Sequence, residues 1–349
     1  MPHLLIWVSL AFLVYVHFGY PLALWVWGRV GARPVRKSFW EPTVSILIAA
    51  HNEQDTIEHK ILNCLELDYP PEKLQIVVAL DAPTDGTEHI VARYDSERIR
   101  VVHLRTHHGK AGALNRAAAV ARGGIFVFAD ARQTFDRGAL RELVANFCDP
   151  DVGSVSGELV LCDKNSREAT DGLGIYWRYE KWLRAQEAAI HSMMGATGAI
   201  YAIRRELYKP IPLDTILDDV AIPMNIVLGG KRAVFDGSAR AYDKISDSPE
   251  IEYGRKVRTL MGNFQILAQK PALLSPLHNP VWLQFVSHKV ARLLVPYFLI
   301  LLFVANLFAL DGAYRWLFAA QCCWYLFTAV GGYLSRRGSL KDVAPAPSR

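Results

Sequence analysis

Acidic side chains recur at four places in the first two-thirds of this 349-residue chain. Glu53, Asp81 and Asp130 each stand just after a short apolar run, and Asp218 and Asp219 form the fourth place. In an open α/β sheet, ligands bind beyond the carboxyl ends of the strands. Carboxylates collected there would suit a nucleotide and its metal ion, because hard divalent cations prefer oxygen ligands.

The apolar runs themselves are rich in β-branched residues and alternate with segments of helical composition. Strands are predicted over residues 43–50, 74–80, 98–104 and 125–129, and helices over residues 52–64 and 110–121. This alternation predicts an α/β fold, a mostly parallel sheet with helices on both faces, in one domain over residues 29–275.

Several nucleotide-binding and metal-binding classes are excluded by missing motifs. The first strand is not followed by G-x-G-x-x-G, and neither Gly109-Lys110 nor Gly230-Lys231 completes a P-loop. None of the five cysteines has C-x-x-C spacing, so no zinc or disulfide framework is predicted. No basic stripe alternates with aromatic residues, which argues against nucleic acid as a partner.

Three segments without Asp, Glu, Lys or Arg flank the soluble part, namely Leu4–Trp27, Leu293–Leu310 and Trp316–Ser335. Each approaches the roughly 20 apolar residues that a helix needs to cross a bilayer. They predict a transmembrane anchor in residues 1–28 and two transmembrane helices in residues 293–335. A signal peptide is the alternative for the first segment, and packing against the others is the alternative for the third.

The remaining membrane-proximal segments are a mixed aromatic and basic stretch and a polar tail. Residues 276–292 suggest an interfacial helix, or else the start of the second span. Residues 336–349 are predicted to be a cytoplasmic tail. Lys and Arg cluster after the first span, before the second and after the third, while the opposite side has Arg315 alone. Such clusters mark the cytoplasmic side. We therefore expect a multi-pass protein of the plasma or inner membrane, with a cytoplasmic catalytic domain.

The polar motifs of the chain are, in order, Ala50-His51-Asn52-Glu53, Asp81 with Thr84-Asp85-Gly86-Thr87, Gly109-Lys110-Ala-Gly-Ala-Leu-Asn115, Asp130, Thr197-Gly198, Asp218-Asp219 and Arg258. Taken in this order and spacing, they resemble the family 2 inverting glycosyltransferases of GT-A type, and the flanking spans fit the membrane-bound branch of that family. The resemblance covers roughly residues 42–269.

The resemblance implies a role for each of these positions. Asp219 would be the general base and Asp218 its supporting neighbour, while Thr197 and Gly198 would face the acceptor. Asp130 stands at the first Asp of the family's DxD motif and would bind Mg²⁺ or Mn²⁺. The expected donor-binding residues are Ala50, His51, Asn52, Glu53, Asp81, Lys110, Asp130, Arg132 and Arg258.

Two departures from the family pattern bear on mechanism. Arg132 replaces the second Asp of DxD, so the motif supplies one carboxylate to a metal ion instead of two. The Arg132 guanidinium either contacts the diphosphate or is a surface group. Thr259 replaces the Trp with which processive synthases of the family cradle their glycan, which favours transfer of one sugar at a time.

Ordinary structural roles compete at several positions. Glu53 could be a first-turn helix acid, Asp81 a turn former, and the pair Asp218-Asp219 a helix N-cap.

The expected function is inverting transfer of a single sugar from a nucleotide-diphosphate sugar, expected to be a UDP-sugar, to a lipid-linked acceptor in exopolysaccharide or cell-envelope glycan synthesis. Two alternatives within the class are a sphingolipid- or glycerolipid-type glucosyltransferase and a small processive synthase. A non-catalytic membrane scaffold that keeps the fold is the alternative from a different class.

Overall fold

The apolar runs form the central strands of one sheet in a computed structural model, which describes residues 1–162, 174–244 and 249–342. These strands are β1 (Val44–Ala50), β2 (Leu74–Asp81), β3 (Ile99–Leu104) and β4 (Ile125–Ala129). All five positions of β4 and six of the seven of β1 are buried. Burial of successive residues means that both faces of the sheet are covered, as the continuous apolar runs predicted.

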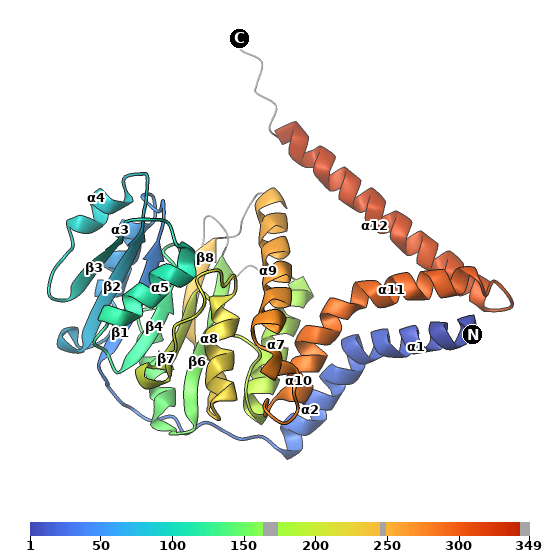
Figure 1. Ribbon diagram of the computed structural model, residues 1–349, viewed down its shortest axis with the longest axis horizontal. Helices are drawn as coiled ribbons and strands as arrows, with labels where there is room; N and C mark the ends of the chain where they lie inside the picture. The colour runs from blue at the N-terminus through green and yellow to red at the C-terminus, as the bar shows by residue number, and fades with distance from the viewer. Residues whose placement is uncertain (163–173, 245–248, 343–349) are drawn as a thin grey trace, which may run out of the picture. The chain divides into compact units, whose positions relative to one another are not determined.

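The described sheet has eight strands in the order β3-β2-β1-β4-β7-β6-β8-β5 (Figure 1). The half formed by β3, β2, β1 and β4 is parallel, with Val44 opposite Leu74 on one side and Ile125 on the other. The other half is mixed, because β7 runs antiparallel to both β4 and β6, while β6 and β8 are parallel. Its strands are β5 (Thr134–Phe135), β6 (Val152–Cys162), β7 (Ile200–Arg204) and β8 (Arg232–Lys244). The predicted α/β class is confirmed, and the parallel arrangement holds for the half that the sequence identified.

Helices connect and cover these strands. They are α3 (Ile57–Leu65), α4 (Thr87–Ala92), α5 (Gly109–Val120), α6 (Ala139–Ala145), α7 (Gly174–Ile190), α8 (Asp218–Leu228) and α9 (Pro249–Gln269). α5 packs on β1 and β2, whereas α6, α7 and α8 contact β8. The helix predicted from residue 52 begins only at Ile57. Asn52 has a left-handed φ of 55°, which a right-handed helix excludes and which Asn tolerates better than most residues.

The chain divides into two compact units. One comprises Leu24–Ile245 and Arg258–Val286 and contains the sheet. The other comprises Met1–Ala23, Ser246–Val257 and Ser287–Arg349 and contains most of the apolar helical sequence.

Two helices are long and apolar enough to cross a membrane by length and composition. The first, Pro2–Val30, consists of α1 (Pro2–Val14), a π-helical turn (Tyr15–Gly19) and α2 (Tyr20–Val30). The second, Trp282–Leu307, consists of α10 (Trp282–Phe285), a π-helical turn (Val286–Val290) and α11 (Ala291–Leu307). From Trp282 onward, therefore, the stretch predicted as an interfacial helix continues into the second apolar helix. The third predicted span lies in α12 (Tyr314–Asp342), which is not one of the two helices that meet the length and composition for crossing a membrane. The presence of three spans therefore remains a prediction.

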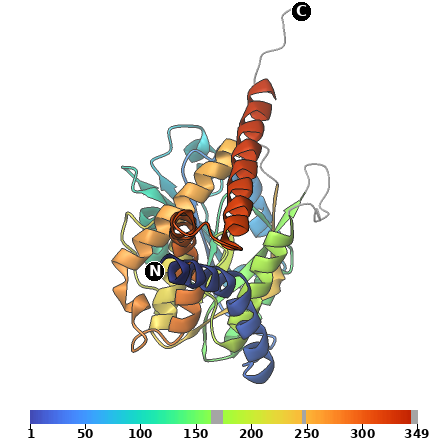
Figure 2. The same cartoon turned by 90° about the vertical axis from the view of Figure 1, so that its right-hand side faces the viewer.

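The apolar helices of the second unit pack through specific contacts. α1 lies beside α11 (Figures 1 and 2). The rings of Phe12 and Phe298 stack there with centroids 3.9 Å apart. The hydroxyls of Tyr15 and Ser287 are 2.6 Å apart. Apolar side chains also remain exposed on these helices, such as Phe18. Exposed apolar surface of this kind marks a membrane or a protein interface.

Candidate active site

A cavity of about 410 Å³ opens at the carboxyl ends of β1, β2 and β4. This is the edge at which open α/β sheets bind ligands. Its lining includes eight of the predicted site residues: Ala50, His51, Glu53, Asp81, Lys110, Asp130, Arg132 and Arg258. The tertiary structure thus brings together residues from the first strand to α9. Asn52, Thr197, Gly198, Asp218 and Asp219 are not among the lining residues.

Lys110 joins two of the predicted acidic positions. Its Nζ lies 2.8 Å from Asp130 Oδ1 and 3.2 Å from Asp218 Oδ1. Lys110 reaches this point because α5 begins at Gly109, whose φ of 74° suits glycine. Burial by itself lowers the pKa of Lys110, but the charges of Asp130 and Asp218 outweigh it and raise the pKa above its usual range. The ammonium group is therefore a permanent cation between two carboxylates.

Asp218 is held from the opposite side by an aromatic pair that the sequence did not reveal. Tyr201 donates its hydroxyl hydrogen to Asp218 Oδ2 at 3.2 Å, and its ring stacks on Phe128 with centroids 4.4 Å apart. Tyr201 is fully buried, and Asp218 is nearly so. The N-cap of α8 is Leu217, without a side-chain capping bond, so neither acid occupies the N-cap position. The capping alternative for Asp218 and Asp219 therefore does not fit this helix.

Asp219 lies against the predicted acceptor segment. Its backbone oxygen accepts a hydrogen bond from Ala196 N at 2.7 Å. A Cβ placed on Gly198 would be only 3.2 Å from Asp219 Oδ2. Thr197 is anchored separately, because its amide donates to Ser156 Oγ at 2.8 Å and its hydroxyl accepts from Arg184 at 3.1 Å. Gly198 is thus the residue of this pair that borders the Asp219 carboxylate.

Asp81 is surrounded by three histidines. Its buried carboxylate accepts the amide of His108 at 2.8 Å on Oδ1, and His107 Nδ1 lies 2.9 Å from Oδ2. His51 Nδ1 lies 2.7 Å from the backbone oxygen of Asp81, and the rings of His51 and His107 are 4.3 Å apart. The next residue, Ala82, has a left-handed φ of 47°. Asp81 therefore both precedes a turn, as predicted, and lines the cavity.

Glu53 and Asn52 organise the turn after β1. The Glu53 carboxylate accepts the Thr56 hydroxyl at 2.7 Å, and its amide donates to Thr87 at 2.8 Å. Asn52 Oδ1 accepts the amide of Thr84 at 2.8 Å, which ties this turn to the loop after β2. Glu53 lines the cavity, whereas Asn52 has a supporting position.

Arg132, which stands where the DxD motif has its second Asp, contacts a strand of the sheet. Its guanidinium forms an ion pair with the buried Asp243 on β8. Gln133 Nε2 also donates to Asp243, at 2.9 Å. Arg132 still lines the cavity and is partly exposed. The guanidinium is thus positioned by a partner from a strand far along the chain, which no local pattern could reveal.

Two further residues support the site without having been predicted. Lys60 is fully buried on α3, and its Nζ donates to the backbone oxygen of Gln133 at 2.9 Å, in the loop that follows Asp130. Burial lowers the pKa of Lys60. Asn115 on α5 binds both backbone groups of Ile211, at 2.8 and 3.0 Å, and so fixes the segment that leads to Asp218. Asn115 could have been predicted as a site residue, because it belongs to the motif that begins with Gly109-Lys110. No sequence pattern indicated a role for Lys60.

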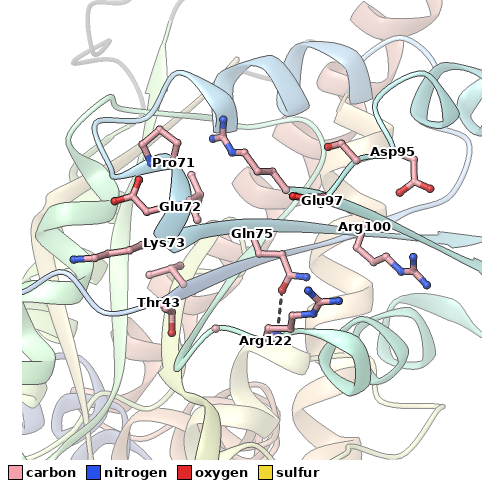
Figure 3. Close-up of a pocket in the computed structure, with 14 residues that line it drawn as sticks. Thr43, Pro71, Glu72, Lys73, Gln75, Asp95, Glu97, Arg100 and Arg122 are labelled. Carbon is pink, nitrogen blue, oxygen red and sulfur yellow. Dashed lines mark hydrogen bonds between the residues drawn. The ribbon is translucent and has the colours of Figure 1, made fainter.

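A second cavity, of about 850 Å³, lies at the opposite edge of the sheet, near the starts of β1 and β2 (Figure 3). Gln75 there accepts the amide of Arg122 at 2.8 Å. None of the predicted site residues lines this cavity. The smaller cavity is therefore the candidate active site, because both its position and its residues match the predicted chemistry.

Known proteins resemble this chain in fold and in sequence. A mannosyltransferase of Pyrobaculum calidifontis, solved in complex with GDP-Man and Mn²⁺, superposes with a TM-score of 0.72 at 24% identity, covering 96% of each chain. At this identity the likeness establishes the fold, which is the fold of a glycosyltransferase.

Sequence relatives are a poly-β-1,6-N-acetyl-D-glucosamine synthase of Staphylococcus aureus and a β-monoglucosyldiacylglycerol synthase of Nostoc sp. The first is 24% identical over 229 residues, which are 64% of this chain and 55% of the relative. The second is 27% identical over 194 residues, which are 54% of this chain and 42% of the relative. The chain thus spans about half the length of these relatives. Residues 45–211 match the glycosyl transferase family 2 model.

Proposed function

We propose that this protein is an inverting glycosyltransferase that moves a single sugar from a nucleotide-diphosphate sugar to a lipid-linked acceptor. One observation carries the proposal: the Lys110 ammonium bridges Asp130 and Asp218 at the cavity, and Asp219 stands next in the chain. Sugar transfer needs positive charge for the leaving diphosphate and a carboxylate to accept a proton. The cavity supplies the positive charge through Lys110 and Arg258, and Asp219, which does not line it, follows directly after the Asp218 that Lys110 contacts.

In the proposed reaction, Asp219 takes the proton of the acceptor hydroxyl. The acceptor oxygen forms its bond to the anomeric carbon while the bond from that carbon to the diphosphate breaks on the opposite face. Lys110 and Arg258 neutralise the departing diphosphate. Asp218, held by Tyr201 and Lys110, keeps the start of α8 in position. Gly198, which has no Cβ, leaves room for the Asp219 carboxylate itself.

A divalent cation, Mg²⁺ or Mn²⁺, fits this site through Asp130 alone. Such ions take one or two carboxylates from the protein and the remaining ligands from phosphates and water. Asp130 is partly exposed at the cavity and holds an ammonium at 2.8 Å, so its carboxylate already attracts a cation. When bound, the ion would supply further neutralisation of the diphosphate. Arg132 is not a metal ligand, and its positive charge would bear on the same phosphates.

The donor is proposed to be a UDP-sugar, with a GDP-sugar as the competing candidate. The buried Asp81 carboxylate can accept an N–H from either base. The mannosyltransferase with the same fold was solved in complex with GDP-Man, which supports the GDP-sugar as the second candidate. Thermal stabilisation of the purified chain by UDP against GDP, each with Mn²⁺, decides between them. Equal stabilisation by both would contradict a base-selective role for Asp81.

The acceptor is proposed to be lipid-linked and the protein to be membrane-bound. The two apolar helices support this, and so does the exposed apolar surface that they carry. The Nostoc relative is named for a glycolipid product, which supports a lipid acceptor and also keeps the glycolipid glucosyltransferase alternative. The Staphylococcus relative is named for a polymer, but Thr259 at the position of the family's Trp favours transfer of one sugar.

The decisive experiment incubates the full chain in detergent with radiolabelled UDP-sugars and defined acceptors. We expect one sugar added to a polyprenyl-diphosphate glycan, and a matched diacylglycerol acceptor tests the glycolipid alternative. Polymer formation would support the processive alternative. Absence of both transfer and donor hydrolysis would favour the scaffold and contradict our proposal.

Membrane orientation is tested separately by cysteine labelling in intact cells. We propose that residues 28–292 and the C-terminus face the cytoplasm. A cysteine near Asp311 should react with an impermeant reagent, whereas one at Ser38 should not. Labelling at Ser38 would contradict the orientation.

A further inference from the structure

We propose that His51, Asp81 and His107 form a binding site for a transition-metal ion such as Zn²⁺, separate from the Mg²⁺ or Mn²⁺ proposed at Asp130. One potential ligand atom from each of the three side chains lies within 4.8 Å of the other two. No other group of three His, Cys, Asp or Glu side chains was found with this spacing in the part of the chain that the structure describes.

One pair of ligand atoms is already near the spacing that a small ion requires. His107 Nδ1 and Asp81 Oδ2 are 2.9 Å apart. Ligands of a tetrahedral Zn²⁺ with bonds of about 2.0–2.1 Å lie roughly 3.3 Å from one another. An ion that replaces the hydrogen now shared by these two atoms needs them to separate by a few tenths of an ångström. The centroid of the His51 ring lies 4.3 Å from that of His107, and binding of all three side chains requires His51 to move toward the ion.

The types of ligand select the kind of ion. Two imidazoles and one carboxylate suit Zn²⁺, Co²⁺ or Ni²⁺, whereas Mg²⁺ takes oxygen ligands almost exclusively. Asp130 offers only carboxylate oxygens, beside the Lys110 ammonium, and so favours Mg²⁺ or Mn²⁺. The two cation sites would therefore differ in chemistry as well as in residues.

The surroundings hold the three ligands in place. Asp81 is buried, and its second oxygen, Oδ1, accepts the amide of His108 at 2.8 Å. The Asp81 backbone oxygen, 2.7 Å from His51 Nδ1, can only accept, so His51 carries its proton on Nδ1 and keeps a lone pair on Nε2. Partners of this kind orient metal-binding histidines in known sites. His51 and His107 are exposed at the cavity, which leaves a path for the ion.

Occupation of this site would have a consequence for the donor, and this part rests on the proposed function. All three ligands line the cavity that we assign to the nucleotide sugar. A bound ion would engage the Asp81 carboxylate that the base needs. Zn²⁺ should therefore compete with the donor and raise its apparent KM.

Metal binding itself is tested without donor. The full chain in detergent is treated with EDTA, desalted and titrated with ZnCl₂ by calorimetry and with CoCl₂ by visible absorption. We expect one equivalent of Zn²⁺ to bind and Co²⁺ to give the absorption of a four- or five-coordinate site. His51→Asn and His107→Asn should each weaken binding by a factor on the order of 10 or more, since even indirect support of a ligand is worth roughly that much.

Matched controls separate this site from its neighbours. His108→Asn removes an adjacent imidazole that is not in the group, and it should leave Zn²⁺ affinity unchanged, as should Asp130→Ala. Melting temperatures of all variants show that they are folded. Absence of binding in the parent, or unchanged affinity in the His51→Asn/His107→Asn double variant, would overturn the site. Loss of binding in Asp130→Ala alone would place the ion elsewhere and also overturn it.

The inhibitory consequence is read from donor kinetics. Zn²⁺ should raise the donor KM of the parent, and His107→Asn should shift this effect to higher Zn²⁺ concentrations. A chain that binds Zn²⁺ but transfers no sugar would contradict the proposed function and leave the metal site standing. An active chain with Zn²⁺ bound and an unchanged KM would overturn the competition.

Discussion

Gly198 makes room for the carboxylate of Asp219. A Cβ on Gly198 would lie 3.2 Å from Asp219 Oδ2, 3.6 Å from its Cγ and 3.5 Å from its Cβ. The contact links the predicted acceptor segment to the predicted base across 21 positions of sequence, and it makes the position of that base sensitive to a single methyl group.

We predict that Gly198→Ala lowers kcat on the order of 10-fold with little change in donor affinity. The added methyl group must displace the Asp219 carboxylate by a few tenths of an ångström, and reaction rates fall steeply when a catalytic group moves. Gly254→Ala is the matched control, because a Cβ there meets nothing within 4 Å. Single-turnover rates and donor binding by calorimetry provide the measurement. Equal rates for both variants would show that Gly198 does not control Asp219.

Asp219→Asn is expected to lower kcat by about 10²–10⁴-fold, the usual value of general-base assistance. The amide keeps the size of the side chain but cannot take the proton, so affinity for the nucleotide sugar should remain nearly unchanged. Asp218→Asn should reduce kcat less and stability more, because Asp218 is buried between Lys110 and Tyr201. If Asp219→Asn matched the parent in kcat, the catalytic assignment would be wrong.

The roles of Asp130 and Arg132 are separated by a metal titration. Asp130→Ala should abolish Mn²⁺-dependent donor binding, because Asp130 is the only protein ligand proposed for that ion. Arg132→Ala should weaken donor binding without altering the metal requirement. It should also lower stability by about 1–3 kcal/mol, because the buried Asp243 loses its ionic partner. Full activity in excess chelator would remove the ion from the mechanism.

Lys60 gives a prediction for the dependence of stability on pH. Burial lowers its pKa in the folded state below the ordinary value of 10.5. Between the lowered pKa and 10.5 the unfolded chain binds a proton that the folded chain does not, so the free energy of unfolding increases with pH in that interval.

The Lys60→Met variant has no titratable group at this position and so lacks this pH-dependent contribution to stability. The parent should therefore gain stability relative to the variant as pH rises towards 10.5, which denaturant unfolding at several pH values measures. Lys209→Met, at an exposed lysine, controls for the loss of a surface charge. A difference between parent and Lys60→Met that does not change with pH would contradict the prediction.

Much of this protein could be predicted from local sequence. Strand ends after β-branched runs placed Glu53, Asp81 and Asp130 at one edge of a sheet, because the carboxyl ends of parallel strands meet there. The four parallel strands and α5 begin and end within one or two residues of their expected limits. The order of the motifs also indicated the family, since their spacing reflects the loops that such a sheet requires.

The tertiary structure alone decided the partners of these residues. Lys110 lies between Asp130 and Asp218, Arg132 binds Asp243, and His107 joins His51 beside Asp81. Each pairing connects residues that are far apart in the chain or on different elements, and it depends on the order of the strands in the sheet. Periodicity along a chain reports which side of an element is buried, but it carries no information about which element packs opposite. The sequence therefore determined the kinds of groups at the site, and only the fold determined which of them form hydrogen bonds and ion pairs with one another.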